Sequence, residues 1–153
     1  MQIKSLVPNP KMQDEGRWID FDKESGVSFK LAYYGNDAFQ AKLRRVAFQS
    51  RRNNRNRALN ASGEKQASIT AIIGTVLLDW KGLDNGFDDK GNGIPYPFTP
   101  ENAEKLLTES KEIFDFVSFE AAQLQNFQEE ETGGLPEGEG ASAELKSGAE
   151  VDA

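Results

Sequence analysis

The residues of this chain with the clearest chemical potential are the carboxylates and amides of one glycine-rich segment, residues 84–93 (DNGFDDKGNG). Similar oxygen donors bind calcium in EF-hand loops, where a glycine is sixth and a bidentate glutamate twelfth. If Gly93 is sixth, Asp88 is first, but Lys90 is third and Thr99 twelfth. A lysine cannot coordinate calcium and no glutamate closes the loop, so the spacing argues against this site. We expect a tight turn with positive φ at its glycines and Asp and Asn side chains bonded to local backbone; weak metal binding is the alternative.

Three further carboxylates, Glu112, Asp115 and Glu120, lie near one another in the sequence and could in principle transfer protons. A catalytic carboxyl group needs a pKa raised by burial or by a neighbouring charge, whereas we expect these three on the solvated face of a helix. The chain has no histidine and no cysteine, which excludes Ser-His and Cys-His hydrolases and zinc sites with nitrogen or sulfur ligands. The sequence therefore predicts a protein that is not an enzyme and has no catalytic residue, cofactor or metal.

Positive charges gather between residues 42 and 57, where no acidic residue occurs. Such a stripe can attract nucleic-acid phosphates, dock an acidic partner or the acidic end of this chain, or serve as a solvated helix face. No helix-turn-helix pattern accompanies it, so we predict no specific nucleic-acid binding. The candidate basic surface consists of Arg44, Arg45, Arg51, Arg52, Arg55 and Arg57.

The net charge of −7 lies in residues 128–153, which hold eight of the 25 acidic residues and one of the 18 basic ones. Residues 1–127 are therefore neutral overall. The C-terminal segment has no aromatic residue and few aliphatic ones, so it cannot bury enough apolar surface to offset the entropy lost on ordering. We predict a disordered acidic tail. Because the chain shows neither a long apolar run nor a signal peptide, we expect no membrane contact and a cytoplasmic location.

The N-terminal part of the chain predicts a β-hairpin. Residues 1–16 contain two prolines and no periodicity, and we expect an extended arm there. Apolar and polar residues alternate over residues 18–22 and again over 27–33, on either side of a turn that contains Gly26. A two-stranded hairpin is only marginally stable by itself, so it must pack on the elements that follow.

Four helices are expected after the hairpin. The spacing of apolar residues predicts the first over about residues 37–59, after an N-cap within residues 35–37, and the second from residue 62 to Trp80. Thr99 and Pro100 begin a short third helix that ends near Thr108. Ser110 or Glu109 caps the fourth, whose apolar stripe continues to residue 127.

The expected fold is α+β and predominantly α, with an N-terminal β-hairpin packed on about four helices. We divide the chain into an extended N-terminal arm (residues 1–16), a single globular α-rich domain (17–127) and a disordered acidic tail (128–153).

The stretch from Thr75 to Phe127 resembles the tail assembly chaperones of tailed bacteriophages, of the siphophage type and in their short form. The resemblance rests on the order Trp-Lys-Gly-Leu, an acidic loop, Ile-Pro-Tyr, Thr-Pro-Glu-Asn and Leu-Leu. It implies a non-enzymatic protein of the host cell cytoplasm that binds and solubilises the tape-measure protein, helps to recruit tail-tube subunits and self-associates. The competing hypothesis is a nucleic-acid-associated accessory protein that uses the arginine-rich helix.

Large apolar residues in or beside the acidic loop are the candidates for the partner-binding surface. A chaperone for an apolar helical rod needs exposed apolar contacts. The alternative is that these residues close the hydrophobic core. The candidates are Trp80, Phe87, Ile94, Tyr96 and Phe98.

Overall fold

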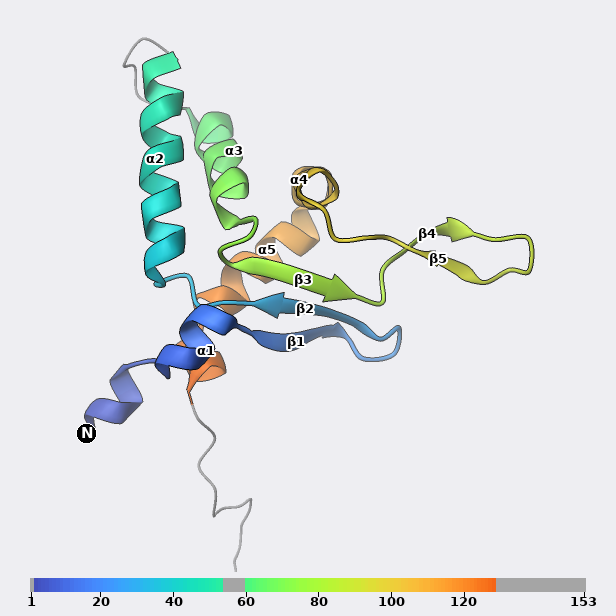
Figure 1. Ribbon diagram of the computed structural model, residues 1–153, viewed down its shortest axis with the longest axis horizontal. Coiled ribbons are helices and arrows are strands. Elements are labelled where there is room, and N and C mark those ends of the chain that lie inside the picture. The colour runs from blue at the N-terminus through green and yellow to red at the C-terminus, as the bar shows by residue number, and fades with distance from the viewer. Residues whose placement is uncertain (1, 54–59, 129–153) are drawn as a thin grey trace, which may run out of the picture.

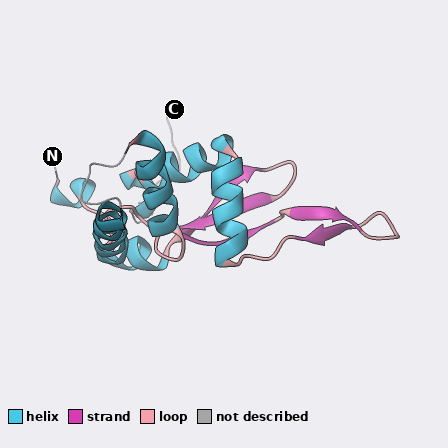
Figure 2. Cartoon of the chain, turned by 90° about the horizontal axis from the view of Figure 1, so that it is seen from above, coloured by secondary structure: helices cyan, strands magenta, loops and turns pink. Residues whose placement is uncertain are grey.

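The computed structural model describes residues 2–53 and 60–128 and has the predicted α+β fold, rich in helix (Figure 1). Figure 2 shows the same arrangement from above, with helices around the base of the sheet and two strands projecting from it. The elements in chain order are η1 (Ile3–Leu6), α1 (Pro10–Glu15), β1 (Arg17–Asp22), β2 (Val27–Leu31), α2 (Asp37–Asn53), α3 (Ala61–Ile72), β3 (Leu77–Lys81), β4 (Asp84–Phe87), β5 (Gly93–Pro95), α4 (Pro100–Glu109), α5 (Lys111–Ala121) and η2 (Leu124–Phe127).

The predicted hairpin forms, but it belongs to a three-stranded antiparallel sheet of order β1-β2-β3. Ile19 pairs with Phe29 across β1 and β2, and Phe29 pairs with Trp80 across β2 and β3. The helix predicted to run to Trp80 is therefore wrong in its last part, because α3 ends at Ile72 and the chain turns at Gly74 with a φ of 83°. The apolar residues that follow gain hydrogen bonds to β2, and this pairing overrides their helical spacing.

The extended N-terminal arm is also a wrong prediction. Asn9 accepts hydrogen bonds from the backbone N–H groups of Lys11 and Met12, and Pro10 occupies the first position of α1. Proline is favoured at that position because its ring fixes a helical φ and its missing N–H would have had no partner. The backbone N–H of Asn9 donates to the carbonyl of Phe127, 2.7 Å away, which ties this end of the chain to η2.

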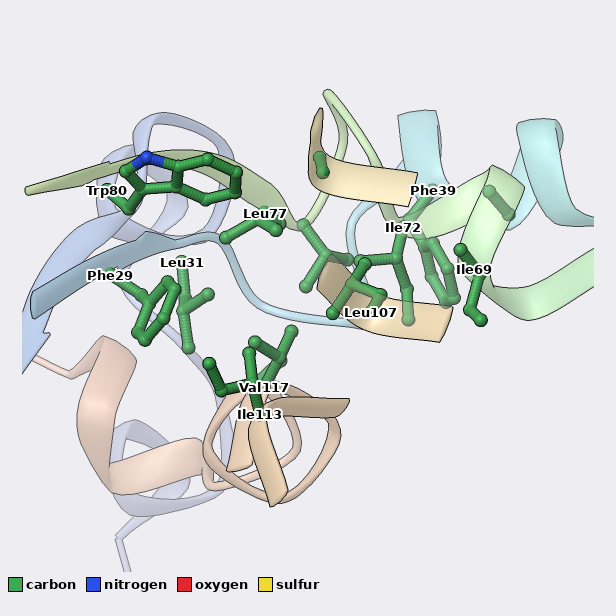
Figure 3. Packing of buried hydrophobic residues seen from close by; sticks show 14 of the residues in the cluster. Phe29, Leu31, Phe39, Ile69, Ile72, Leu77, Trp80, Leu107, Ile113 and Val117 are labelled. Carbon is green, nitrogen blue, oxygen red and sulfur yellow. The ribbon is translucent and has the colours of Figure 1, made fainter. Parts of the chain in front are cut away.

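One hydrophobic cluster joins the sheet to α2, α3, α4 and α5. Figure 3 shows Phe29 and Leu31 from β2 pointing toward Val117 of α5, while Ile69, Ile72 and Leu107 meet where α3 and α4 adjoin the sheet. Phe116 of α5 adds ring contacts with the sheet. The sheet is therefore covered by α5 on one face.

The helix caps beyond the sheet follow the prediction. Thr99 accepts from the backbone N–H of Asn102, and Ser110 accepts from that of Ile113. The predicted stripe to residue 127 breaks after Ala121, and its end forms η2. Residues 54–59 of the predicted first helix and residues 129–153 of the predicted tail lie outside the described residues.

Gly82 and Gly26 provide a matched test of the backbone geometry at the end of the sheet. Both have positive φ values, 84° and 77°, but a Cβ added at Gly82 would collide with the carbonyl oxygen of Gly26, whereas one added at Gly26 would meet no atom within 4 Å. Positive φ costs a non-glycine residue about 1–2 kcal/mol, and the collision forces a further backbone shift. We expect Gly82→Ala to lower the free energy of unfolding by at least about 1 kcal/mol more than Gly26→Ala in urea titrations. Equal losses of unfolding free energy in the two variants would contradict a close approach of Gly82 to the backbone of Gly26.

Candidate partner-binding hairpin and basic helix

The glycine-rich segment forms a second β-hairpin, β4–β5, in which Asp84 pairs with Pro95 and Phe87 with Gly93. Its turn has the predicted hydrogen bonds, since the Asp88 carboxylate accepts from the backbone N–H groups of Lys90 and Asn92, each at 2.9 Å. The predicted positive φ is found at Gly91, at 81°, but not at Gly93, which pairs with Phe87 in β5. Among the described residues, no group of three or more acidic side chains lies close enough together to hold a metal ion. The hairpin is thus shaped by hydrogen bonds within its own turn.

Trp80 anchors the base of this hairpin to the core. Its ring, only 6% exposed, lies parallel to the ring of Tyr96 with 5.7 Å between centroids. Phe98 meets the same ring edge-on at 4.9 Å, and the indole N–H donates to the Tyr96 carbonyl oxygen at 2.7 Å. Three of the five candidate contact residues therefore pack against the core and hold the hairpin in place, as the core alternative predicted; Trp80 is buried, and Tyr96 and Phe98 are half-buried.

Phe87 and Ile94, the other two candidates, are 75% and 45% exposed. Figures 1 and 2 both show β4 and β5 projecting beyond the end of β3, away from the helices. Among the described residues, these two strands pair only with each other. The hairpin therefore presents apolar side chains to solvent on an arm that is fixed at its base.

The second candidate surface lies on α2, which packs beside α3 (Figure 1). Arg44, Arg45, Arg51 and Arg52 are all exposed, whereas Arg55 and Arg57 lie outside the described residues. Lys42 differs from these arginines because it is half-buried and its Nζ donates to the carbonyl of Ile73 at 2.7 Å. Burial lowers the pKa of Lys42, and the nearby charge of Arg45 lowers it further. Lys42 thus joins α2 to α3, while the arginines face solvent.

The three carboxylates considered for acid–base chemistry are not gathered into a buried site. Asp115 pairs with Lys111 one helical turn away, and both are exposed. Glu112 is exposed, and Glu120 is half-buried and accepts from the side-chain amide of Asn126 at 3.1 Å. Glu112 and Asp115 thus lie on the predicted solvated face, whereas Glu120 is only partly exposed.

The sequence analysis missed two features of α2, the exposure of Phe48 and the burial of Asn36, although it expected an N-cap within residues 35–37. Phe48 lies among the arginines of α2 and is exposed, and Asn36 is buried at the start of the same helix. The signal for Phe48 is its distance of nine residues from Phe39, which places the two rings on opposite sides of a helix. Nothing local distinguishes Asn36 from an ordinary exposed cap, because the contact that sets it apart is with the carbonyl of Thr75, 39 residues further along the chain.

Comparisons with known proteins give one result at the level of the family. No curated protein and no solved structure matches the chain. No helix in the described residues is long and apolar enough to cross a membrane. The family model described as YdaY prophage protein matches residues 34–134, a region that includes both candidate surfaces and more than half of the 153-residue chain. The protein therefore belongs to the YdaY prophage protein family and is phage-related.

Proposed function

We propose that this phage-related protein is a tail assembly chaperone, without enzymatic activity, that acts in the host cell cytoplasm. It binds the tape-measure protein, keeps it soluble, helps to recruit tail-tube subunits and self-associates. The observation that carries the proposal is the projecting β4–β5 hairpin, which exposes Phe87 and Ile94.

The physical support lies in how this hairpin is held. A long helical rod with apolar stripes aggregates unless another protein covers the stripes, and covering them requires exposed apolar side chains. An isolated two-stranded hairpin would be too weakly structured to present them. The ring contacts among Trp80, Tyr96 and Phe98 fix its base, so less backbone entropy is lost when the hairpin binds a partner.

The double substitution Phe87→Thr and Ile94→Thr tests this function. Threonine keeps the preference for strands while removing most of the apolar surface. Truncating a central apolar anchor often costs 2 kcal/mol or more, so we expect at least about tenfold weaker binding to the tape-measure protein of the same phage. The measurement is co-expression, followed by the yield of soluble tape-measure protein and of the co-purified complex, with unchanged thermal unfolding of the variant.

Phe119→Gln is the matched control, because Phe119 is also an exposed phenylalanine but lies on α5. It should leave the yield of complex unchanged. The proposal is wrong if the double variant solubilises the tape-measure protein as well as the unaltered protein does, or if the unaltered protein has no effect on it. Substitutions at Tyr96 and Phe98 are less informative, since they disturb the base of the hairpin.

The exposed arginines of α2 favour a second candidate, a nucleic-acid-associated accessory protein. Each phosphate contact adds about one unit to the dependence of log affinity on log salt, so a four-arginine face would give a steep salt dependence. Replacing Arg44, Arg45, Arg51 and Arg52 with glutamine would remove this binding and leave the tape-measure complex intact. Tight, sequence-selective binding at physiological salt would favour this candidate over the chaperone.

A further inference from the structure

An exposed aromatic ring lies at the centre of the basic face of α2. Phe48 is 65% exposed and comes nine residues after the buried Phe39. With 3.6 residues per turn, nine residues place the two rings about half a turn apart, so Phe48 points away from the core. Residues three and four positions away are neighbours on a helix surface. For Phe48, all four such neighbours are arginines: Arg44, Arg45, Arg51 and Arg52.

These charges have no counter-charge within the described residues. No carboxylate there lies within ion-pair distance of the four arginines. Among all the described residues, the rings that lie beneath a cation are Phe114 and Trp18, so no cation covers the ring of Phe48. The face therefore combines an uncovered apolar ring with four uncompensated positive charges, which fits an acidic segment that carries a few aliphatic side chains.

We infer that this face of α2 docks the acidic C-terminal segment of the same chain, residues 129–153. That segment carries all eight acidic residues beyond position 127 and a single basic residue, Lys146, whereas the rest of the chain is neutral. Leu135, Leu145 and Val151 are spread among its acidic residues and supply the apolar contacts that Phe48 lacks. The charges and the apolar residues of the two surfaces are thus complementary.

The segment is long enough to reach this face. Gln128, the last described residue, follows η2. Figure 1 shows η2 at the opposite end of the molecule from the C-terminal end of α2. Twenty-five residues span up to about 80 Å when extended. The 17-residue helix α2 is about 25 Å long, and a compact body of this size has a radius of gyration of about 14 Å. Docking within one molecule therefore requires no change in the body.

The consequence is a covered basic face. A docked acidic segment competes with nucleic acids and other polyanions for the arginines, and its hold weakens as salt screens the charges. This inference does not depend on the chaperone function, because it concerns α2 and leaves the β4–β5 hairpin free.

The absence of cysteine allows a direct test in the full-length chain. A nitroxide label on Ser142→Cys broadens the backbone amide signals of residues near it. We expect selective broadening of the signals of residues 44–53 at low salt and its loss at about 1 M salt, where the screening length falls to about 3 Å. Equal broadening throughout the body, or none on α2, would overturn the inference.

Three further variants separate docking from general charge attraction. Glutamine at Arg44, Arg45, Arg51 and Arg52 should reduce the broadening on α2 at least about fivefold, since several exposed ion pairs are lost together. Glutamine at the exposed Lys11, Lys23, Lys90 and Lys105 removes the same charge elsewhere and should leave it unchanged. Phe48→Ala, which keeps every charge, should reduce it at least about twofold. Equal effects of the two charge variants, or no effect of Phe48→Ala, would contradict docking on this face.

A mixture of spin-labelled chains and unlabelled, isotope-enriched chains identifies whose segment occupies the face. Docking within one molecule predicts no broadening in this mixture, whereas broadening on α2 would assign the face to the segment of a second copy and overturn the inference. Adding a single-stranded polynucleotide should displace the label only at stoichiometric or higher concentration. If the polynucleotide binds α2 equally well in a variant whose eight acidic C-terminal residues are changed to amides, the segment does not cover the face.

Discussion

Replacing Trp80 with alanine is expected to lower the free energy of unfolding by about 3–5 kcal/mol, as is usual when a buried aromatic residue is truncated. The ring lies among Phe29, Tyr96 and Phe98, so its removal opens a cavity where β3 meets the base of the β4–β5 hairpin. It also removes the indole N–H bond to the Tyr96 carbonyl. The measurement is urea unfolding followed by far-ultraviolet circular dichroism. Because small domains are stable by only about 5–15 kcal/mol, this variant will be near its unfolding threshold.

The other tryptophan of the chain provides the control. Trp18 on β1 is exposed, and the Lys81 ammonium group lies 4.5 Å from its ring centroid. Exposed cation–ring contacts contribute about 0.5–1 kcal/mol, so Trp18→Ala should cost about 1 kcal/mol. Trp80→Phe, which keeps an aromatic ring but loses the N–H donor, should fall between the two. If Trp80→Ala costs no more than Trp18→Ala, the ring cluster does not anchor the hairpin.

Asn36→Ala is expected to lower the free energy of unfolding by about 2–4 kcal/mol. The Asn36 side chain accepts from the backbone N–H of Phe39 at 2.8 Å, which caps α2. Its amide also donates to the carbonyls of Tyr33 and Thr75, at 2.6 and 3.0 Å. Loss of a cap costs about 0.5–2 kcal/mol, and a buried polar group left without a partner costs about 1–3 kcal/mol. Asn36 thus connects the end of β2, the start of α2 and the turn before β3.

Asn60 provides the matched comparison for this residue. It caps α3 by accepting from the backbone N–H of Gly63 at 2.7 Å, but it is exposed. Asn60→Ala should therefore cost only about 0.5–1 kcal/mol, the effect of a lost exposed cap. Asn36→Asp keeps an acceptor for Phe39 but loses the donor, so it should be destabilising as well. Equal losses for Asn36→Ala and Asn60→Ala would show that the bonds to the two carbonyls contribute nothing.

The sequence by itself determined the features that depend on residues close together in the chain. The caps at Thr99 and Ser110, the hairpin around Gly26 and the turn at Asp88 were predicted correctly because each needs only side chains and backbone within a few positions. The absence of histidine and cysteine likewise removed whole classes of chemistry without reference to any fold.

The tertiary structure decided the features that depend on distant partners. Residues 77–81 have helical apolar spacing, yet they form a strand because the open edge of β2 supplies backbone hydrogen bonds that a local pattern cannot reveal. The same pairing places Trp80 in the core beside Tyr96 and Phe98, and leaves Phe87 and Ile94 exposed beyond it. Burial depends on what the rest of the chain packs against, so five residues of similar character were separated into an anchor and an exposed surface only by the fold.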